Sequence, residues 1–251
     1  MMLRVFWRLF ANNVSVTLAY RGAFFLYMVL TVLSPLIALS VWLTVSEQGV
    51  ALPYSRDQFV TYYVMLAFVV MLTGNWAAPY VADTIRTGSM SPWLLRPAPV
   101  ALDYVANNLG EKVIKAPLLL PLVGLVALLF REDLSLPADP ARWGLFALSL
   151  PLAAVLAFLL DFVIGILAFW IENVTGLARV KSVAGAFLEG QLVPLALFPA
   201  WLAPFLAAQP FRFVVSFPLE ILTGRLNGPA IGWGFAAQAG YCIALFALYR
   251  V

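Results

Sequence analysis

Long runs without charged side chains are the feature that most constrains how this chain can fold. No charge occurs within residues 22–46 or 58–82, and four further runs are predominantly apolar. An α-helix needs about 20 apolar residues to cross a hydrocarbon core of roughly 30 Å. The sequence therefore predicts an all-α integral membrane protein with six transmembrane helices. These helices are expected at residues 22–46, 58–82, 110–130, 143–171, 183–200 and 228–249.

The composition supports a membrane protein over a soluble one. Hydrophobic residues make up 63% of the chain and charged residues 11%, whereas soluble domains have about 45–50% and about 25%. A transmembrane β-barrel would show segments of about ten residues with alternating hydrophobicity, and the runs here are continuous blocks. We therefore expect one transmembrane domain over residues 1–251.

Lysine and arginine are unevenly divided between the two sides of the predicted topology. Ten of the 15 fall on the side that would hold both chain ends, and cytoplasmic loops carry an excess of these residues. Both termini are therefore expected in the cytoplasm. The predicted cytoplasmic set is Arg4, Arg8, Arg21, Arg86, Arg96, Lys112, Lys115, Arg179, Lys181 and Arg250, and the outer set is Arg56, Arg131, Arg142, Arg212 and Arg225.

The N-terminal segment, residues 3–20, has the composition of an interfacial helix. It mixes aromatic and aliphatic side chains with arginine and asparagine. Such a helix lies along the membrane surface with its apolar face in the lipid. We expect it on the cytoplasmic leaflet before the first span, and the alternative is an N-terminal extension of that span.

The predicted cytoplasmic loop between the second and third spans, residues 83–109, contains the signal for a short helix. Ser91 followed by Pro92 places a capping residue beside a proline at the first helical position. Arg96 before Pro97 ends the element, because the residue before proline is disfavoured in the α region. An apolar face separates these signals: Trp93, Leu94 and Leu95. Exposed apolar surface of this kind usually contacts something, here membrane lipid or a protein partner.

An ordered set of motifs along the chain resembles the permease subunits of the ABC-2 transporter family, in the bacterial branch where two permeases often accompany one ATPase. The motifs are Tyr20-Arg21, Ile85-Arg86-Thr87-Gly88, Trp93-Leu94-Leu95-Arg96-Pro97, Gly190-Gln191-Leu192-Val193-Pro194-Leu195 with Phe198-Pro199, and Pro210-Phe211, Pro218 and Gly224. The resemblance covers nearly the whole chain in order and spacing. It implies a multi-pass protein of the bacterial cytoplasmic membrane.

The resemblance implies roles for two segments. The helix between spans two and three would be a coupling helix that docks on an ATPase. Its residues would be Arg86, Gly88, Trp93, Leu94, Leu95, Arg96 and Pro97. Residues 201–227 would form a re-entrant segment between spans five and six, on the outer side. This segment is apolar but interrupted by prolines, which agrees with a hairpin that does not cross. Its marker residues are Pro210, Phe211, Pro218 and Glu220.

The resemblance also implies partners. The sequence contains no phosphate-binding loop of the form G-x-x-x-x-G-K-[ST], so ATP and Mg²⁺ are expected on a separate subunit. Two copies of that subunit and a second permease, identical or related, would complete the transporter. The loops are short and no importer-type coupling loop is visible, which favours export. The cargo is expected to be a hydrophobic or amphipathic small molecule or a lipid, because the spans offer few polar groups.

Two acidic residues, Asp161 and Glu189, fall well inside predicted spans, away from their ends. Asp161 lies in the cytoplasmic half of the fourth span and Glu189 about two turns into the fifth. A carboxylate in the membrane costs about 2.5–3.5 kcal/mol on insertion scales, so both should face the bundle or water. They either line the translocation path or pair with a neighbour such as Arg179 or Lys181. Arg212 and Glu220 are expected to pair with each other at the surface.

Several other functions are disfavoured. The chain has no histidine and one cysteine, Cys242, so the commonest general base and metal ligand are missing and no multi-cysteine metal site is possible. We expect no enzyme activity and no cofactor on this chain. Basic residues are scattered, so no nucleic-acid partner is expected.

A stand-alone secondary carrier or channel is the alternative function. Carriers usually contain internal repeats and midplane ionisable groups, and no repeat is apparent between the two halves. An intramembrane enzyme is a third possibility, but Asp161 has no obvious aspartate partner in another span.

Overall fold

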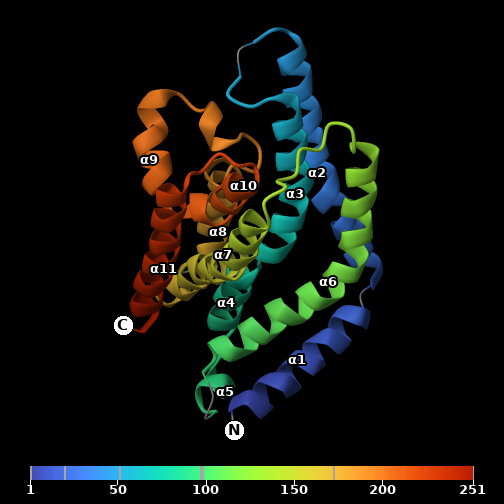
Figure 1. The fold of residues 1–251 in the computed structure, drawn as a ribbon. Coiled ribbons are helices and arrows are strands. Elements are labelled where there is room, and N and C mark those ends of the chain that lie inside the picture. Colours follow the sequence, from blue (N-terminus) through green and yellow to red (C-terminus); the bar gives the residue numbers. More distant parts are fainter. Residues whose placement is uncertain (1, 20, 51, 97–98, 172, 251) are drawn as a thin grey trace.

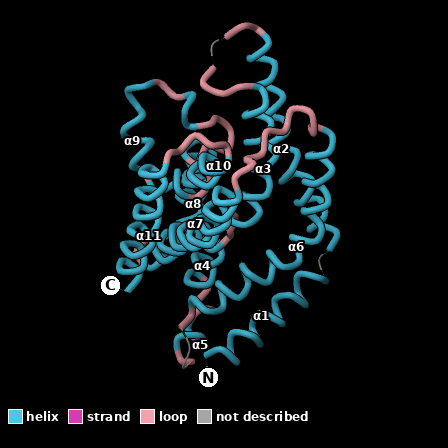
Figure 2. The backbone as a smooth tube through the Cα atoms, viewed as in Figure 1, coloured by secondary structure: helices cyan, strands magenta, loops and turns pink. Residues whose placement is uncertain are grey.

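The computed structural model describes residues 2–19, 21–50, 52–96, 99–171 and 173–250. In this part of the chain every regular element is a helix (Figures 1 and 2), which confirms the all-α prediction. The α-helices are α1 (Met2–Ala19), α2 (Arg21–Glu47), α3 (Arg56–Thr73), α4 (Ala77–Arg86), α5 (Ser91–Leu94), α6 (Ala101–Leu129), α7 (Pro140–Ile166), α8 (Val174–Leu188), α9 (Ala203–Ala208), α10 (Ser216–Leu222) and α11 (Gly228–Arg250). The 3₁₀ helices are η1 (Leu167–Phe169), η2 (Leu195–Leu197), η3 (Ala200–Leu202) and η4 (Pro210–Phe213).

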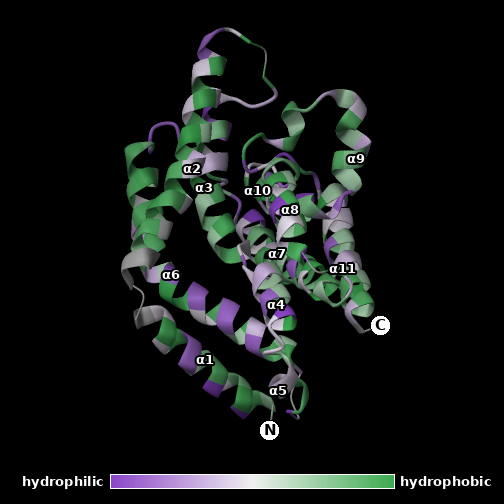
Figure 3. Cartoon of the chain, turned by 180° about the vertical axis from the view of Figure 1, so that it is seen from behind, coloured by the Kyte–Doolittle hydropathy of each residue, from purple (hydrophilic) through white to green (hydrophobic). Residues whose placement is uncertain are grey.

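Among the described residues, five helical stretches are long and apolar enough to cross a membrane. They are Met28–Glu47, Arg56–Arg86, Ala101–Leu129, Pro140–Phe169 and Gly228–Tyr249. They correspond to the predicted first, second, third, fourth and sixth spans. Figure 3 shows that hydrophobic residues cover most of these helices, whereas hydrophilic residues gather on α1 and on the first half of α6.

The predicted span at residues 183–200 does not form one helix, so this part of the prediction was wrong. Helix α8 ends at Leu188, and Gly190 follows with a φ of +83°. That φ lies in the left-handed region, which glycine adopts without steric cost and which ends a right-handed helix. Pro194 and Pro199 then hold extended backbone, with ψ values of 135° and 143°. Between Gly190 and Leu202 the chain forms two short 3₁₀ turns, η2 and η3, rather than a continuous helix.

Helix α6 begins earlier than the predicted third span, at Ala101 instead of residue 110. The last third of the predicted loop 83–109, residues 101–109, is therefore helical. Pro117 and Pro121 lie inside α6, and proline in a helix interior removes a hydrogen bond and bends the helix. In Figure 1 the first half of α6 runs obliquely and the second half stands upright.

The predicted amphipathic segment at residues 3–20 forms α1, with Tyr20 outside the described residues. Helix α1 runs beside the oblique half of α6 and at an angle to α2 (Figure 1), so it does not extend the first span in line. Asn107 of α6 donates a hydrogen bond to Asn13 of α1, with 3.2 Å between Nδ2 and Oδ1. Leu3 and Trp7 remain exposed on α1.

The main hydrophobic core lies between α2, α3, α7 and α10. Phe59 and Tyr62 of α3 are among its largest fully buried side chains. Every residue of α10 is buried, although this helix has only seven residues. The segment between α8 and α11 therefore returns into the protein interior and provides part of the core.

Candidate functional site

The predicted coupling element is a tight turn followed by the one-turn helix α5. Helix α4 ends at Arg86, whose guanidinium pairs with Asp83 across 2.8 Å. Gly88 has a φ of +72°, which lets the chain reverse, and the Met90 amide then donates to the Thr84 carbonyl at 3.0 Å. The turn therefore fixes the direction in which α5 leaves α4.

The predicted cap of α5 was wrong by one residue. Ser91 is the first helical residue, Met90 occupies the capping position, and no side chain caps the helix. Burial explains this, because the Met90 side chain is only 7% exposed and packs in a second core cluster with Val81, Tyr104 and Phe162. Packing of an apolar side chain outweighs a cap of about 1 kcal/mol.

This second cluster connects α5 to the long helices. Val81 belongs to α4, Tyr104 to α6 and Phe162 to α7. The hydroxyl groups of Thr84 and Tyr104 also share a hydrogen bond of 2.6 Å. The residue before α5 is therefore packed against three helices in one cluster.

The tip of α5 presents apolar side chains to its surroundings, as the sequence predicted. Leu94 is 61% exposed and Leu95 is 88% exposed. Trp93 is partly buried, and the Arg96 guanidinium lies 4.0 Å from the centre of its ring, which is cation–π geometry. Pro97 lies outside the described residues.

A polar groove lies next to this element, between α4 and the start of α8. It has a volume of about 500 Å³, and its polar lining includes Asp83, Arg86, Asn173 and Thr175. Arg86 therefore borders both the turn before α5 and the groove. The residues from α8 were not expected from the sequence, because nothing in their local pattern indicates a partner on α4.

Asp161 forms an ion pair with Lys181, with 2.8 Å between Oδ1 and Nζ. The two side chains are 7% and 16% exposed, and they join α7 to α8. Of the two cations considered from the sequence, Lys181 is the partner within ion-pair distance. Glu189 is also buried, and the Gln191 side chain donates to its Oε2 at 2.6 Å.

The non-helical segment that follows α8 is held in place by side chains from four other parts of the protein. Each donor binds a backbone carbonyl between residues 188 and 192. The donors are Gln209 to Leu188 at 2.8 Å, Ser216 to Glu189 at 2.8 Å, Tyr62 to Gly190 at 2.9 Å, and Tyr63 and Trp42 to Leu192 at 2.9 and 3.1 Å. A helix end buried without partners is costly, so these bonds stabilise the break. We call this set of donors and carbonyls the carbonyl clamp.

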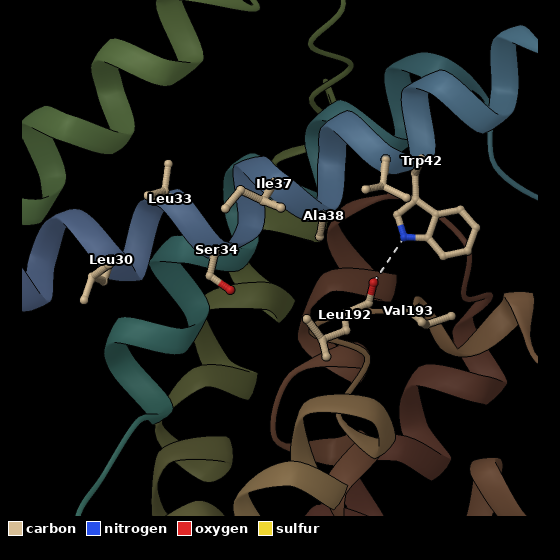
Figure 4. A pocket seen from close by; sticks show the side chains of 9 residues that line it. Leu30, Leu33, Ser34, Ile37, Ala38, Trp42, Leu192 and Val193 are labelled. Atoms are coloured by element: carbon tan, nitrogen blue, oxygen red, sulfur yellow. Dashed lines mark hydrogen bonds between the residues drawn. The ribbon is translucent and has the colours of Figure 1, made fainter.

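An open apolar groove lies beside the carbonyl clamp (Figure 4). It has a volume of about 480 Å³ and runs along α2 towards Leu192 and Val193. The side chains from α2 are Leu30, Leu33, Ser34, Ile37, Ala38, Val41 and Trp42. Figure 4 shows Trp42 reaching across to the Leu192 carbonyl at one end of the groove.

The predicted markers of the re-entrant segment fall on two short helices. Pro210 and Phe211 begin η4, and Pro218 and Glu220 lie in the buried helix α10. Arg212 pairs with Glu220 across 2.6 Å, as the sequence predicted. Their side chains are 20% and 10% exposed, so the pair is partly buried rather than at the surface.

Comparison with known families identifies the class of protein. The family described as ABC-2 family transporter protein matches residues 28–251. The chain therefore belongs to the ABC-2 family of multi-pass transporter membrane proteins, as the motif resemblance indicated. A search of curated proteins found no match.

Proposed function

We propose that this chain is the permease subunit of an ATP-driven exporter in a bacterial cytoplasmic membrane. It would work with two ATP-binding subunits and a second permease, identical or related. The observation that carries the proposal is the exposed leucine pair at the tip of α5, on a helix anchored by Met90 in a cluster shared by α4, α6 and α7.

The structure of the coupling element supports this role physically. Two adjacent leucines exposed on a rigid turn form a small apolar anchor of the kind that fits a pocket on a partner. Arg86 and Arg96 lie beside this anchor and would contact the rim of such a pocket. ATP-driven closure of the partner would then push α5, and the second core cluster would pass the displacement to the long helices.

We propose a six-crossing topology with both termini in the cytoplasm. Five candidate spans alone would put the chain ends on opposite sides of the membrane. In Figure 1 the start of α1, the end of α11 and α5 lie in the lower half, whereas the α2–α3 loop and α9 lie in the upper half. We infer that α8 and the irregular segment after it make the remaining crossing, and that residues 201–227 form the re-entrant segment.

The proposed cargo is a hydrophobic or amphipathic small molecule or a lipid. The groove along α2 is lined almost entirely by apolar side chains and is open on one side. A second permease facing this groove would enclose an apolar path. Asp161 and Glu189 contribute to this path only if they exchange their present partners, since Lys181 and Gln191 now bind them.

Purification of the tagged chain from its native host tests the proposal. An ATP-binding subunit should co-purify in gentle detergent, and the reconstituted complex should transport only with hydrolysable ATP. Transport by the isolated chain in liposomes without ATP would instead establish a carrier or channel and contradict the proposal.

A further inference from the structure

A second apolar groove lies on a different part of the surface, between α6, α7 and α11. Its volume is about 650 Å³, within the range of roughly 300–1,000 Å³ typical of ligand sites. Several of its apolar side chains are substantially exposed: Leu109 at 43%, Val155 at 49%, Ile243 at 70% and Phe246 at 50%. Because these lining side chains are exposed, the groove is accessible from outside the protein, and a flexible chain can enter it.

One end of this groove carries a lysine. Lys112 lines the groove together with Asn108, and its Nζ donates to Asn108 Oδ1 at 2.6 Å. The neighbouring Lys115 is buried and pairs with Glu111 on the same helix. Within the described residues, no carboxylate lies within ion-pair distance of Lys112. Lys112 therefore forms no ion pair in this part of the chain, and Glu111, the acidic side chain that acts on it electrostatically, is already paired with Lys115.

The position of Lys112 along α6 is suited to a headgroup. Lys112 precedes Pro117 in α6, and the first half of this helix runs obliquely beside the amphipathic helix α1 (Figure 1). In the orientation proposed above, this is the level of the cytoplasmic headgroups. Phe246 and Tyr249 of α11 and Phe158 of α7 line the adjoining apolar wall.

We propose that this groove binds one anionic phospholipid of the cytoplasmic leaflet, with its phosphate on Lys112 and an acyl chain along α7 and α11. Charge complementarity selects this occupant, because Lys112 lines an apolar groove without forming an ion pair, and its acidic neighbour Glu111 already pairs with Lys115. Lipid tails are as apolar as leucine, so the groove itself does not distinguish one phospholipid from another. Headgroup preference therefore depends on Lys112, and one lysine near a membrane corresponds to about a fivefold preference for anionic lipid.

Native mass spectrometry of the purified transporter tests this inference. The detergent-solubilised complex is titrated with phosphatidylglycerol and with phosphatidylethanolamine of matched acyl chains. The wild type should bind phosphatidylglycerol about fivefold more tightly. Lys112→Gln should abolish this preference, whereas Lys112→Arg should retain it. Arg8→Gln is the matched charge control, because Arg8 is an exposed cation on α1 outside the groove.

A second pair of variants tests the groove itself. Ala154→Trp fills the groove from α7 and should reduce binding of both lipids. Ala147→Trp is the control, because Ala147 is exposed on the same helix and does not line the groove. Equal headgroup preference in the wild type and in Lys112→Gln would overturn the proposal. Separation of the two permeases by Ala154→Trp, with lipid binding unchanged, would assign the groove to a protein contact and also overturn it.

The readout is lipid binding in detergent, so it does not require ATP-driven transport. Failure of the lipid site would leave the proposed function intact. Failure to find an ATP-binding partner would likewise leave the lipid site testable on the purified chain.

Discussion

Lys181 of α8 lies 2.8 Å from Asp161 of α7, and this ion pair is largely withdrawn from solvent. Each side chain compensates the desolvation of the other. Because α8 is short and ends at a break, an ion pair to the long helix α7 helps to fix its position. We therefore propose a structural role for this pair.

Removing one member of this pair should destabilise the protein. Lys181→Gln leaves the buried carboxylates Asp161 and Glu189 without this cation and should cost about 3–5 kcal/mol. Asp161→Asn should cost less, because Glu189 still acts on the buried lysine. The double variant should recover part of the loss caused by Lys181→Gln, because Glu189 then remains as one buried carboxylate instead of two. Thermal unfolding and the yield of folded complex measure the effect. Normal folding of both single variants with abolished transport would instead assign Asp161 to the translocation path.

The break after α8 should be intolerant of substitution at Gly190. A Cβ on Gly190 would lie 2.3 Å from Ser216 Oγ and 2.6 Å from the Tyr62 hydroxyl, and its φ is +83°. Gly190→Ala should therefore prevent folding or displace α10. Gly176→Ala, at an open helical position on α8, should be neutral or stabilising by about 1 kcal/mol. Similar expression and melting temperature of both variants would contradict this account.

Tyr62→Phe tests the carbonyl clamp more gently. The variant keeps the aromatic ring but removes the hydroxyl group that donates a 2.9 Å hydrogen bond to the buried Gly190 carbonyl. An unsatisfied buried acceptor costs about 1–3 kcal/mol. The melting temperature of the purified protein should fall accordingly, and an unchanged value would show that the bond does not stabilise the break.

The sequence predicted the five long helices, because length and apolar composition are enough to identify a candidate membrane span. It did not predict the end of α8 at Leu188, although Gly190, Pro194 and Pro199 were visible, because hydropathy does not register backbone breaks. It also missed the carbonyl clamp. The Tyr62 hydroxyl and the Gly190 carbonyl are separated by 128 residues in the chain, and only the tertiary fold brings them together.

The start of α5 shows a different limit of sequence reasoning. Ser91 before Pro92 is a good local signal for a cap, but burial of Met90 among residues of three other helices shifts the helix start. The pairing of Arg212 with Glu220 was predictable because the residues are close in sequence. Its partial burial was not, since that depends on α10 entering the core.

The proposed topology predicts the location of six reporter fusions. Fusions after Gln48, Asp139 and Leu226 should report the outer side of the membrane. Fusions after Pro99, Arg179 and Val251 should report the cytoplasm. A cytoplasmic signal after Leu226 would show that the irregular segment after α8 does not reach the outer side. This result would rule out the proposed crossing by α8 and that segment.

Arg86 and Arg96 should contribute less to ATPase binding than Leu94 and Leu95. Arg96→Ala removes a guanidinium stacked on Trp93, and Arg86→Ala removes an exposed ion pair with Asp83. Exposed charges at an interface rim act mainly through screened electrostatics. Both variants should weaken ATPase binding at low salt and approach the wild type in about 1 M salt. A loss that is independent of salt would show that these residues do not act as rim charges.

The central claim is that the tip of α5 docks on an ATP-binding subunit. The most direct measurement is co-purification of that subunit with Leu94→Ala/Leu95→Ala, with cargo-stimulated hydrolysis in proteoliposomes as a second readout. If each leucine is an anchor worth about 2 kcal/mol, each truncation weakens binding roughly 30-fold. The control is Leu128→Ala/Leu129→Ala, an exposed pair at the far end of α6. We expect the α5 variant to insert and fold but to lose the ATPase, and the control to keep it. Wild-type ATPase retention and stimulation in the α5 variant would contradict the account.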